Sequence, residues 1–414
     1  MRILLWHGYL LGGTGSNVYT RQLAREWTRS GHDVTVFCQE QNPGGYDVGG
    51  AAVVRPDVGG LLPVFVLDRY AGYDVRLVGD CTRAELNRWV EANAVALREH
   101  LPADLLFCNH VLLGGPVGVA SGAPFAVKVH GSELEYALRG NRALAAWGGD
   151  CLGKAAATFI GSDHTGRVLE DVCGTVDRVH KVPPGVDIWK WKPAARRTAL
   201  EALLAELGQN PPNPGNAEER LPDEGIAERL KHFLAGDRPT VVYFGKLMRN
   251  KGVHLLLEAL DGLDARAVIV GFGDYREELE RRAVGDVLFT GALEHRHLTH
   301  LLALADVWVV PSIYPEALGM VAAEAAATGC PPLVARHAGL AEIAANLAEE
   351  YPRELRHLVA FSPGDASDLR STLDQLLTLD VSDRESLRSA ARRVAVDRWS
   401  WESVAHRLLE AVSG

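Results

Sequence analysis

The sequence predicts an α/β protein built from two Rossmann-like domains in tandem. Short runs rich in β-branched residues alternate with longer helical patterns along the chain, which is typical of βαβ units and parallel sheets. This pattern restarts after about residue 187, and 414 residues exceed the ~150 of one average domain. The chain also holds 42 glycines, more than the usual share of ~7%, as expected where turns separate many strands and helices.

The expected strands follow from the short apolar runs. In the first half they are residues 2–6, 33–38, 51–55, 104–108, 125–130 and 157–161. In the second half they are residues 240–245, 265–271, 286–290, 306–311 and 332–335. The first helix is expected to begin after an N-cap at Ser16 and to end at Gly31, with a core-facing stripe of Tyr19, Leu23 and Trp27.

Prolines and glycines mark the domain boundary. Pro183-Pro184-Gly185 cannot continue a helix or a central strand. We therefore expect one domain over residues 1–187 and a second over 188–395. After a break at 397–400, a last helix is expected within residues 396–414. Residues 208–225, rich in proline and glycine, are expected to form a surface insertion without chemistry.

Charge and cysteine usage exclude several classes of function. Asp and Glu number 53 against 43 Lys and Arg, so the net charge of -10 would repel nucleic acid. The six cysteines form no Cys-x-x-Cys pair, which favours a reduced, cytoplasmic setting. The apolar start is interrupted at His7, too early for a signal peptide, and Asp306 and Pro311 break the longest apolar stretch, so no membrane span is expected.

The first glycine turn, Gly12-Gly13-Thr14-Gly15, lies between the first strand and the first helix. Its spacing resembles a dinucleotide fingerprint, but Val18 stands where the third glycine belongs. The turn is therefore interpreted as a loop whose backbone amides hold a phosphate or a sugar, or as a turn without a ligand.

The second turn runs from Gly245 to Gly252 and carries Lys246, Arg249 and Lys251 just before a helix. Cations are unfavourable at a helix N-terminus, which already carries partial positive charge, unless an anion binds there. We expect Lys246 and Lys251 to hold a diphosphate. The alternative is that these lysines are simply exposed to solvent.

The third segment combines two glutamates with an alanine-rich helix expected to start near Leu318. Glu316 and Glu324 are eight residues apart, which places them about 80° from one another on a continuous helix. Glu324 is expected to accept hydrogen bonds from ribose hydroxyls and Glu316 from sugar hydroxyls, while amides near Leu318 and Gly319 point at the ligand. A helix-capping carboxylate and a surface ion pair are the alternatives.

The Glu-x7-Glu pair resembles that of glycosyltransferase family 4. The resemblance covers nearly the whole chain, through Gly12-Gly13, His130-Gly131, Pro184-Gly185-Val186-Asp187, the Gly245 to Gly252 turn, Gly271-Phe272-Gly273 and the stretch from Ala338 to Glu342. It implies a GT-B fold, in which two parallel sheets face a central cleft. It also implies a retaining hexosyltransferase that binds a nucleotide diphosphate sugar in the donor-binding C-terminal domain and an acceptor in the N-terminal domain. The helix within residues 396–414 would pack back on the N-terminal domain.

The resemblance also implies roles for single residues. His130 would contact the sugar beside the anomeric carbon, the Gly12-Gly13 loop would bring Gly13 to the diphosphate from the other domain, and base contacts would fall near Gly273 and Leu293. Three departures stand out. Lys246 replaces the usual arginine, so a planar fork of donors becomes a point charge. Pro184 replaces the usual asparagine, and the usual glycine pair after the Glu-x7-Glu helix is reduced to Gly339-Leu340.

The residues also suggest how the leaving diphosphate is stabilised. The chain contains no Asp-x-Asp motif to hold a divalent metal, so we expect metal-independent transfer in which the lysines stabilise the developing charge. His295, His297 and His300 lack a completing carboxylate and are not expected to bind metal. No cofactor is expected; the donor base and sugar leave little trace in side chains, and a UDP-sugar is the expected donor.

The acceptor is expected to bind the N-terminal domain. It would be a hydroxyl of a small molecule or glycan, contacted by residues at the carboxyl ends of the strands: Thr14, Asn17, Lys128 and Glu133. The alternatives to a glycosyltransferase are a nucleotide-sugar epimerase or hydrolase on the same fold, and a catalytically silent nucleotide-sugar-binding protein. Nothing in the sequence indicates an oligomeric state.

Overall fold

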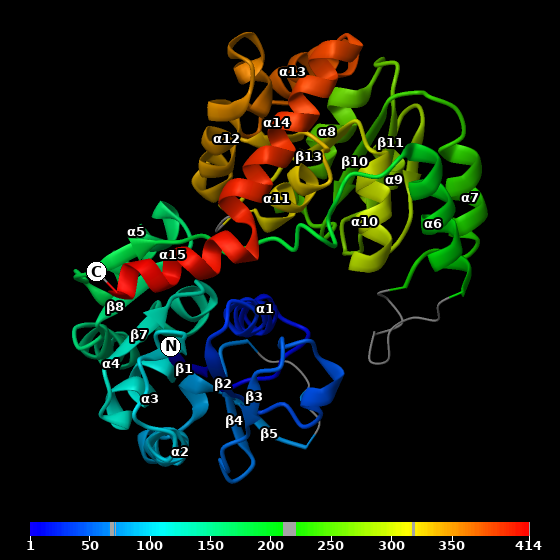
Figure 1. The fold of residues 1–414 in the computed structure, drawn as a ribbon. Helices are drawn as coiled ribbons and strands as arrows, with labels where there is room; N and C mark the ends of the chain where they lie inside the picture. Colours follow the sequence, from blue (N-terminus) through cyan, green and yellow to red (C-terminus); the bar gives the residue numbers. More distant parts are fainter. Residues whose placement is uncertain (67–69, 71, 210–220, 317–318, 414) are drawn as a thin grey trace. The chain divides into compact units, whose positions relative to one another are not determined.

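A computed structural model describes residues 1–66, 70, 72–209, 221–316 and 319–413 (Figure 1). The chain divides into two compact units. The N-terminal unit contains residues 1–185 and 401–414, and the C-terminal unit contains residues 186–400. The division between them thus falls at residue 185, two residues before the position expected from the prolines.

The N-terminal unit is built on a seven-stranded parallel sheet in the order β3-β2-β1-β6-β7-β8-β9, beside a separate β4-β5 pair. Its helices and strands are β1 (Arg2–Trp6), α1 (Gly15–Arg29), β2 (Asp33–Phe37), η1 (Pro43–Gly45), β3 (Ala52–Val54), β4 (Leu61–Val64), β5 (Asp74–Leu77), η2 (Val78–Asp80), α2 (Arg83–Arg98), β6 (Leu105–Asn109), α3 (Gly114–Ser121), β7 (Phe125–Lys128), η3 (Leu134–Leu138), α4 (Arg142–Leu152), β8 (Ala157–Ile160), α5 (Asp163–Cys173), β9 (Val179–Lys181) and α15 (Trp401–Ser413).

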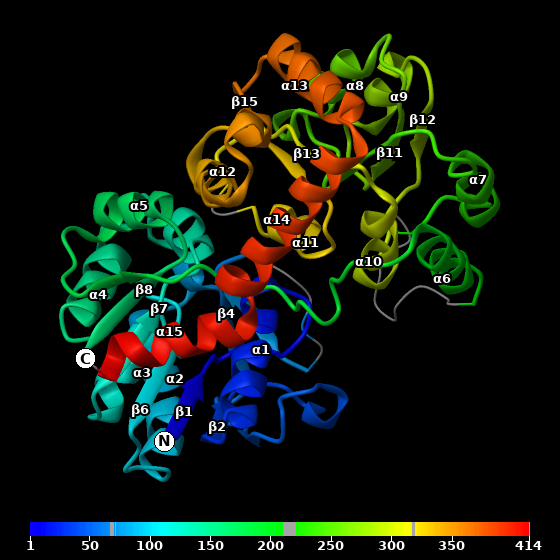
Figure 2. The same cartoon turned by 45° about the horizontal axis from the view of Figure 1, so that its top comes forward.

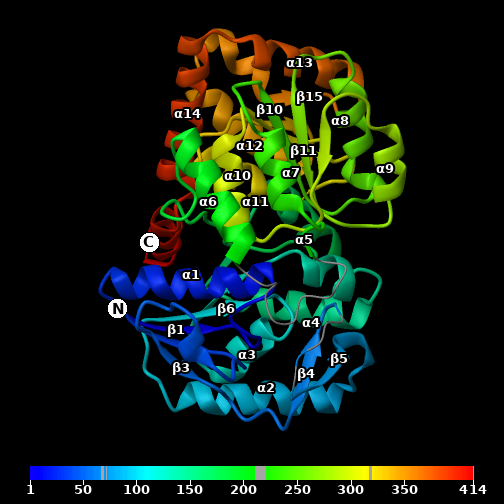
Figure 3. The same cartoon turned by 90° about the vertical axis from the view of Figure 1, so that its right-hand side faces the viewer.

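Both faces of this sheet are buried. Ile3 and Leu5 point into a cluster shared with α1 and α15, whereas Leu4 and Trp6 point into a cluster with α2 and α3. Figure 3 shows α1 and α2 on opposite sides of the strands. The last helix, α15, packs on α1, where Trp27 Nε1 donates a hydrogen bond to the carbonyl of Ala405 at 3.1 Å.

The C-terminal unit repeats the same plan around a six-stranded parallel sheet in the order β12-β11-β10-β13-β14-β15 (Figure 2). Its helices and strands are α6 (Arg196–Gln209), α7 (Ile226–Phe233), β10 (Thr240–Phe244), η5 (Arg249–Lys251), α8 (Val253–Leu260), β11 (Arg266–Val270), α9 (Arg276–Arg282), β12 (Val287–Phe289), α10 (His295–Leu304), β13 (Val307–Val310), α11 (Met320–Ala327), β14 (Pro332–Ala335), α12 (Ala338–Glu350), η6 (Arg353–Val359), β15 (Ala360–Phe361), α13 (Ala366–Thr378) and α14 (Val381–Trp399).

The strand orders place a switch point in each sheet. Successive strands are added first on one side of β1 and then, from β6 onward, on its other side; β10 and β13 mark the same change in the second sheet. Ligands of open α/β sheets bind outside the carboxyl ends of the strands at such points. The turns that follow β1, β6, β10 and β13 are therefore the places to look for chemistry.

Every strand expected from the sequence is present within one or two residues, and β4, β5, β9 and β15 were not expected. One detail of the expected helices was wrong: Thr14, not Ser16, is the N-cap of α1, because its side chain accepts from the amide of Asn17. The break expected within 397–400 falls at Ser400, between α14 and α15. The helix that follows Glu316 begins at Met320, two residues after Leu318. Among the helices in the described ranges, none is long and apolar enough to cross a membrane.

Candidate active site

An ion pair at the carboxyl end of the C-terminal sheet joins two of the expected site residues. Lys251, in the turn after β10, places Nζ 2.5 Å from Oε1 of Glu316, in the loop after β13, and both side chains are half-buried. Ser312 Oγ lies 2.9 Å from the same carboxylate oxygen and donates to it. The amide of Gly339, at the start of α12, donates to the carbonyl of Glu316 at 3.0 Å. The Glu316 loop is therefore held from two sides.

The local fold brings these two turns together. Gly252 adopts a φ of +69°, and a Cβ atom there would lie 1.9 Å from the carbonyl oxygen of Pro311. Only glycine permits so close an approach of the turn after β10 to the end of β13. The amides of Ile313 and Tyr314 then donate to the carbonyl of Asn250, at 2.9 and 3.1 Å, which fixes the loop beside Lys251.

Lys246 lies in the same turn but in a different environment. Its side chain is exposed and makes no ion pair with any residue that the structure describes, while its carbonyl accepts a hydrogen bond from the Tyr243 hydroxyl at 2.9 Å. The guanidinium of Arg249 lies over the ring of Tyr275, 5.8 Å from its centroid. The turn therefore presents Lys246 to solvent and Lys251 to Glu316.

Glu324 lies in the middle of α11 and is half-buried. Burial raises the pKa of its carboxyl to about 8, against the attraction of the nearby Lys190, which lowers it. The expectation that Glu316 and Glu324 share a helix face is wrong, because Gly319 caps α11 with a φ of +80° and Glu316 precedes the helix. Leu318 lies outside the described residues.

The remaining donor-side residues lie at the same edge of the sheet. Gly273 follows β11 and is exposed, and Leu293 follows β12 and is buried. Since all strands of this sheet are parallel, both lie at the edge that carries Lys251. The Leu247 amide, in the cationic turn, donates to the carbonyl of Phe272 at 2.8 Å, so the turns after β10 and β11 are joined.

In the N-terminal unit, His130 follows β7 and is half-buried. Its Nε2 lies 2.7 Å from Oδ1 of Asn109, and its amide donates to Glu133 Oε1 at 2.9 Å. Burial lowers the pKa of His130 well below its usual value, and the neighbouring His110, Lys128 and His7 lower it further. The imidazole is therefore neutral at physiological pH.

Two further histidines adjoin His130 and were missed by sequence reasoning. The rings of His110 and His130 are 4.6 Å apart, and His7 stacks on His110 at 5.8 Å. His110 Nδ1 bonds to Glu133 at 3.3 Å, and His7 Nε2 to Asn17 at 2.7 Å. Burial lowers the pKa of His7 to about 3. Their positions in the sequence could have indicated them, since His7 directly follows β1 and His110 directly follows β6, two neighbouring strands.

The residues expected to contact an acceptor are mostly committed to the protein interior. Lys128 is buried and donates to the carbonyl of Val182 at 2.9 Å, with a pKa lowered by burial to about 7. Glu133 is fully buried and hydrogen-bonded to His110 and to the amide of His130. Asn17 is buried and hydrogen-bonded to His7 and to the carbonyl of Gly12. Only Thr14 is partly exposed, beside Gly13, which is open to solvent.

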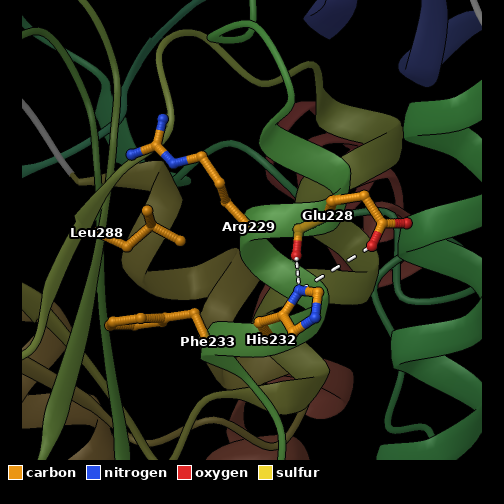
Figure 4. Close-up of a pocket in the computed structure, with 5 residues that line it drawn as sticks. All are labelled: Glu228, Arg229, His232, Phe233 and Leu288. Atoms are coloured by element: carbon orange, nitrogen blue, oxygen red, sulfur yellow. Dashed lines mark hydrogen bonds and ion pairs between the residues drawn. The ribbon is translucent and has the colours of Figure 1, made fainter.

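A shallow depression of about 530 Å³ lies between α7 and β12 of the C-terminal unit, and none of the expected site residues lines it (Figure 4). Its lining consists of Glu228, Arg229, His232, Phe233 and Leu288. Over the described part of the chain, no group of three or more His, Cys, Asp or Glu side chains is placed to hold a metal ion. His297 instead accepts a hydrogen bond from the amide of Glu294 at the start of α10.

Two family models match the chain. The model for Glycosyltransferase Family 4 matches residues 13–190, and that for glycosyl transferases group 1 matches residues 226–394. A sulfoquinovosyl transferase of Arabidopsis thaliana is 33% identical over 174 residues, which are 42% of this chain and 32% of that protein. A GDP-mannose-dependent alpha-(1-6)-phosphatidylinositol monomannoside mannosyltransferase of Mycolicibacterium smegmatis is 27% identical over 319 residues, 72% of this chain and 73% of that protein.

Solved structures share the fold. HepE of Anabaena, solved in complex with UDP, superposes with a TM-score of 0.69 at 17% identity, and the match covers 100% of both chains. This likeness confirms the expected GT-B fold of two Rossmann-like units. Because the two family models together match most of the sequence, the chain belongs to glycosyltransferase family 4, with a group 1 glycosyl transferase domain in its C-terminal unit.

Proposed function

We propose that this glycosyltransferase moves a sugar from a nucleotide diphosphate sugar to a hydroxyl acceptor, with retention of anomeric configuration and without a metal ion. The observation that carries the proposal is the pairing of Lys251 with Glu316 at the carboxyl ends of β10 and β13, with Lys246 in the same turn. This arrangement sets fixed cations and a carboxylate at the switch point of one sheet, where charged parts of a ligand bind.

The chemistry follows from these charges. The donor diphosphate would displace Glu316 from Lys251 and bind both lysines, which leaves the Glu316 carboxylate to accept hydrogen bonds from sugar hydroxyls. Glu324 would accept hydrogen bonds from the ribose. As the bond from the anomeric carbon to the phosphate oxygen breaks, the lysines stabilise the charge that develops on the diphosphate.

The acceptor hydroxyl would then attack on the face that the diphosphate leaves. The new bond joins the acceptor oxygen to the anomeric carbon, and the acceptor proton passes to the departing phosphate oxygen. No protein carboxylate is needed as a nucleophile in this route. His130 would contact the sugar, and the Gly12-Gly13 loop would approach the diphosphate.

The relatives support a nucleotide sugar as the donor class. The mycobacterial relative is named for its dependence on GDP-mannose, and the Anabaena neighbour was solved with UDP. We propose a UDP-sugar as the donor and a small-molecule or glycan hydroxyl as the acceptor.

A panel of UDP-, GDP-, ADP- and TDP-sugars in thermal-shift measurements tests the donor, because a ligand of the native state raises its apparent stability. We expect one nucleotide class to raise the Tm, and no response to any would overturn the proposal. The same donor is then incubated with and without acceptor extract, with EDTA added in parallel.

Product that forms only with acceptor, is unaffected by EDTA and keeps the donor's anomeric configuration by NMR supports all parts of the proposal. Donor isomerised or hydrolysed without acceptor would identify an epimerase or hydrolase instead. Loss of transfer with EDTA would contradict metal independence alone.

A further inference from the structure

Hydrogen bonds link Thr20, Asn109 and His130, and each of them can have only one donor and one acceptor. Thr20 Oγ1, in α1, donates to the carbonyl of Ser16 at 2.8 Å, so its single hydrogen is used. The Asn109 side-chain nitrogen, 3.2 Å from this hydroxyl oxygen, must therefore donate to it. The same nitrogen donates to the carbonyl of Trp6 at 3.3 Å. Two oxygen partners on one side fix which end of the Asn109 amide is nitrogen.

This orientation decides the hydrogen on His130. The Asn109 oxygen faces His130 Nε2 at 2.7 Å and can only accept, so Nε2 carries the hydrogen. A neutral imidazole carries one hydrogen, and its other nitrogen, Nδ1, then holds a lone pair. Within the described residues Nδ1 has no hydrogen-bond partner, and it is not among the fully enclosed nitrogen atoms that lack one.

The surroundings keep the ring neutral. The rings of His110 and Tyr19 lie 4.6 and 5.1 Å from the ring of His130, and His110, Lys128 and His7 all lower its pKa. The Glu133 carboxylate bonds to the main chain of His130 and to His110 rather than to the His130 ring. Nearby positive charge, with no carboxylate bonded to the ring, disfavours the protonated imidazolium form of His130.

The turn that carries Asn109 is strained. Asn109 is fully buried at the end of β6, and the following turn contains two non-glycine residues with positive φ, His110 at +72° and Leu113 at +67°. Such residues cost about 1–2 kcal/mol each and persist where the surroundings fix them, often at functional sites.

We propose that Asn109 is a positioning residue, which holds His130 as the Nε2-H tautomer so that Nδ1 accepts a hydrogen bond from a sugar hydroxyl. The inference rests on the proposed function for the identity of this ligand and on the hydrogen-bond chain for the tautomer. It makes His130 a hydrogen-bond acceptor in the reaction and not a proton donor.

The tautomer is measured directly, without any activity, by long-range ¹H–¹⁵N NMR of histidine-labelled protein, with His130 assigned by comparison with His130→Ala. We expect the Nε2-H tautomer in the wild type and a mixture or reversal in Asn109→Leu. The matched control is Asn93→Leu, since Asn93 is another fully buried asparagine of the same unit, bonded to Trp6 Nε1 and the Trp89 carbonyl but to no histidine.

Kinetics then link the tautomer to turnover. Asn109→Leu is expected to lower kcat about tenfold, the effect of one lost hydrogen bond, while Asn93→Leu changes stability only. Asn109→Asp places a carboxylate on Nε2, so the variant should gain an acid limb in its pH profile as His130 becomes protonated.

The Nδ1-H tautomer in the wild type would overturn the inference, and so would an unchanged tautomer in Asn109→Leu. If Asn109→Leu does not fold, the wild-type spectrum and the Asn109→Asp profile still decide it. The expected tautomer in a protein that transfers no sugar would refute the proposed function and leave the positioning role of Asn109 intact.

Discussion

Lys251 is the side chain whose loss separates chemistry from stability most clearly. Its pair with Glu316 is half-buried, so Lys251→Ala should change the free energy of unfolding by at most about 1 kcal/mol. Loss of a fixed charge opposite the leaving diphosphate should lower kcat by about 100-fold or more. Turnover and urea midpoints of the variant test this expectation.

Lys231→Ala is the matched control, because Lys231 pairs with Glu228 on the exposed face of α7 in the same unit. Its turnover should equal that of the wild type. Equal turnover of Lys251→Ala and Lys231→Ala would remove Lys251 from the mechanism.

The raised pKa of Glu324 predicts how the stability of the protein depends on pH. Its carboxyl has a pKa of about 8 in the folded protein against a usual value of 4.5. Between these values the folded state binds one more proton than the unfolded state, so this contribution to stability is complete below pH 4.5 and lost as the pH rises through 8. Glu324→Gln cannot lose a proton, and its Tm relative to wild type should rise between about pH 5 and 9. A Tm difference that is constant over this range would show that Glu324 is ionised throughout.

Single side chains could be predicted from the sequence only where a charge stood out against its surroundings. Lys251 and Glu316 were predicted as site residues, and the structure brings them into contact. His7 and Asn109 were missed, because a buried histidine or asparagine beside a strand leaves no pattern in composition or spacing. Lys128 and Glu133 were expected to contact an acceptor, but both are buried on partners that lie far away in sequence, the carbonyl of Val182 and the ring of His110. Charged residues are rarely buried without a partner, and the sequence alone does not indicate these partners.

In the turn from β10 to α8, Gly252 is required both for its backbone conformation and for a close approach to Pro311. Gly252 and Gly225 both cap a helix, with φ of +69° and +68°, but a Cβ atom would lie 1.9 Å from the carbonyl of Pro311 at Gly252 and touch nothing within 4 Å at Gly225. Gly225→Ala should cost about 1 kcal/mol for its conformation alone. Gly252→Ala should cost at least about 2 kcal/mol more, and it should also lower turnover by displacing Lys251.

Chemical denaturation of the two variants isolates the close approach, since the backbone conformation is the same in both. Equal losses of stability would mean that the turn moves away from β13 at little cost, and that Lys251 is held by something other than this contact.

Strands with a continuous apolar run could be predicted as elements, whereas strands without one could not. β10 and β13 carry such runs and are found where expected. β9 reads Val-His-Lys and β15 contains only two residues, so neither shows an apolar run or an alternation that could be recognised. The helix after Glu316 begins later than expected because its cap is Gly319 in a left-handed conformation, and a conformation of this kind is not written in the hydrophobic pattern.

The whole chain forms two units, of which the first is discontinuous. The alternation of strands and helices predicts two parallel sheets, and the restart after the prolines predicts where the second begins. The return of the last helix to the first unit could be expected only from resemblance, because an amphipathic helix does not specify which apolar face it covers. In the structure α15 buries Trp401, Val404 and Leu408 in the cluster that contains Ile3 and Trp27.

This organisation makes neighbouring parts of the chain report on different units. Leu408, in α15, and Leu387, in α14, are both fully buried, but Leu408 belongs to the core of the N-terminal unit and Leu387 to that of the C-terminal unit. Either substitution by alanine should cost about 2–5 kcal/mol, the usual effect of removing a buried leucine side chain. In hydrogen exchange of the full-length protein, Leu408→Ala should speed exchange in β1 and α1, and Leu387→Ala in α11 and α12. Faster exchange in α11 for Leu408→Ala, with β1 and α1 unchanged, would assign the last helix to the C-terminal unit instead.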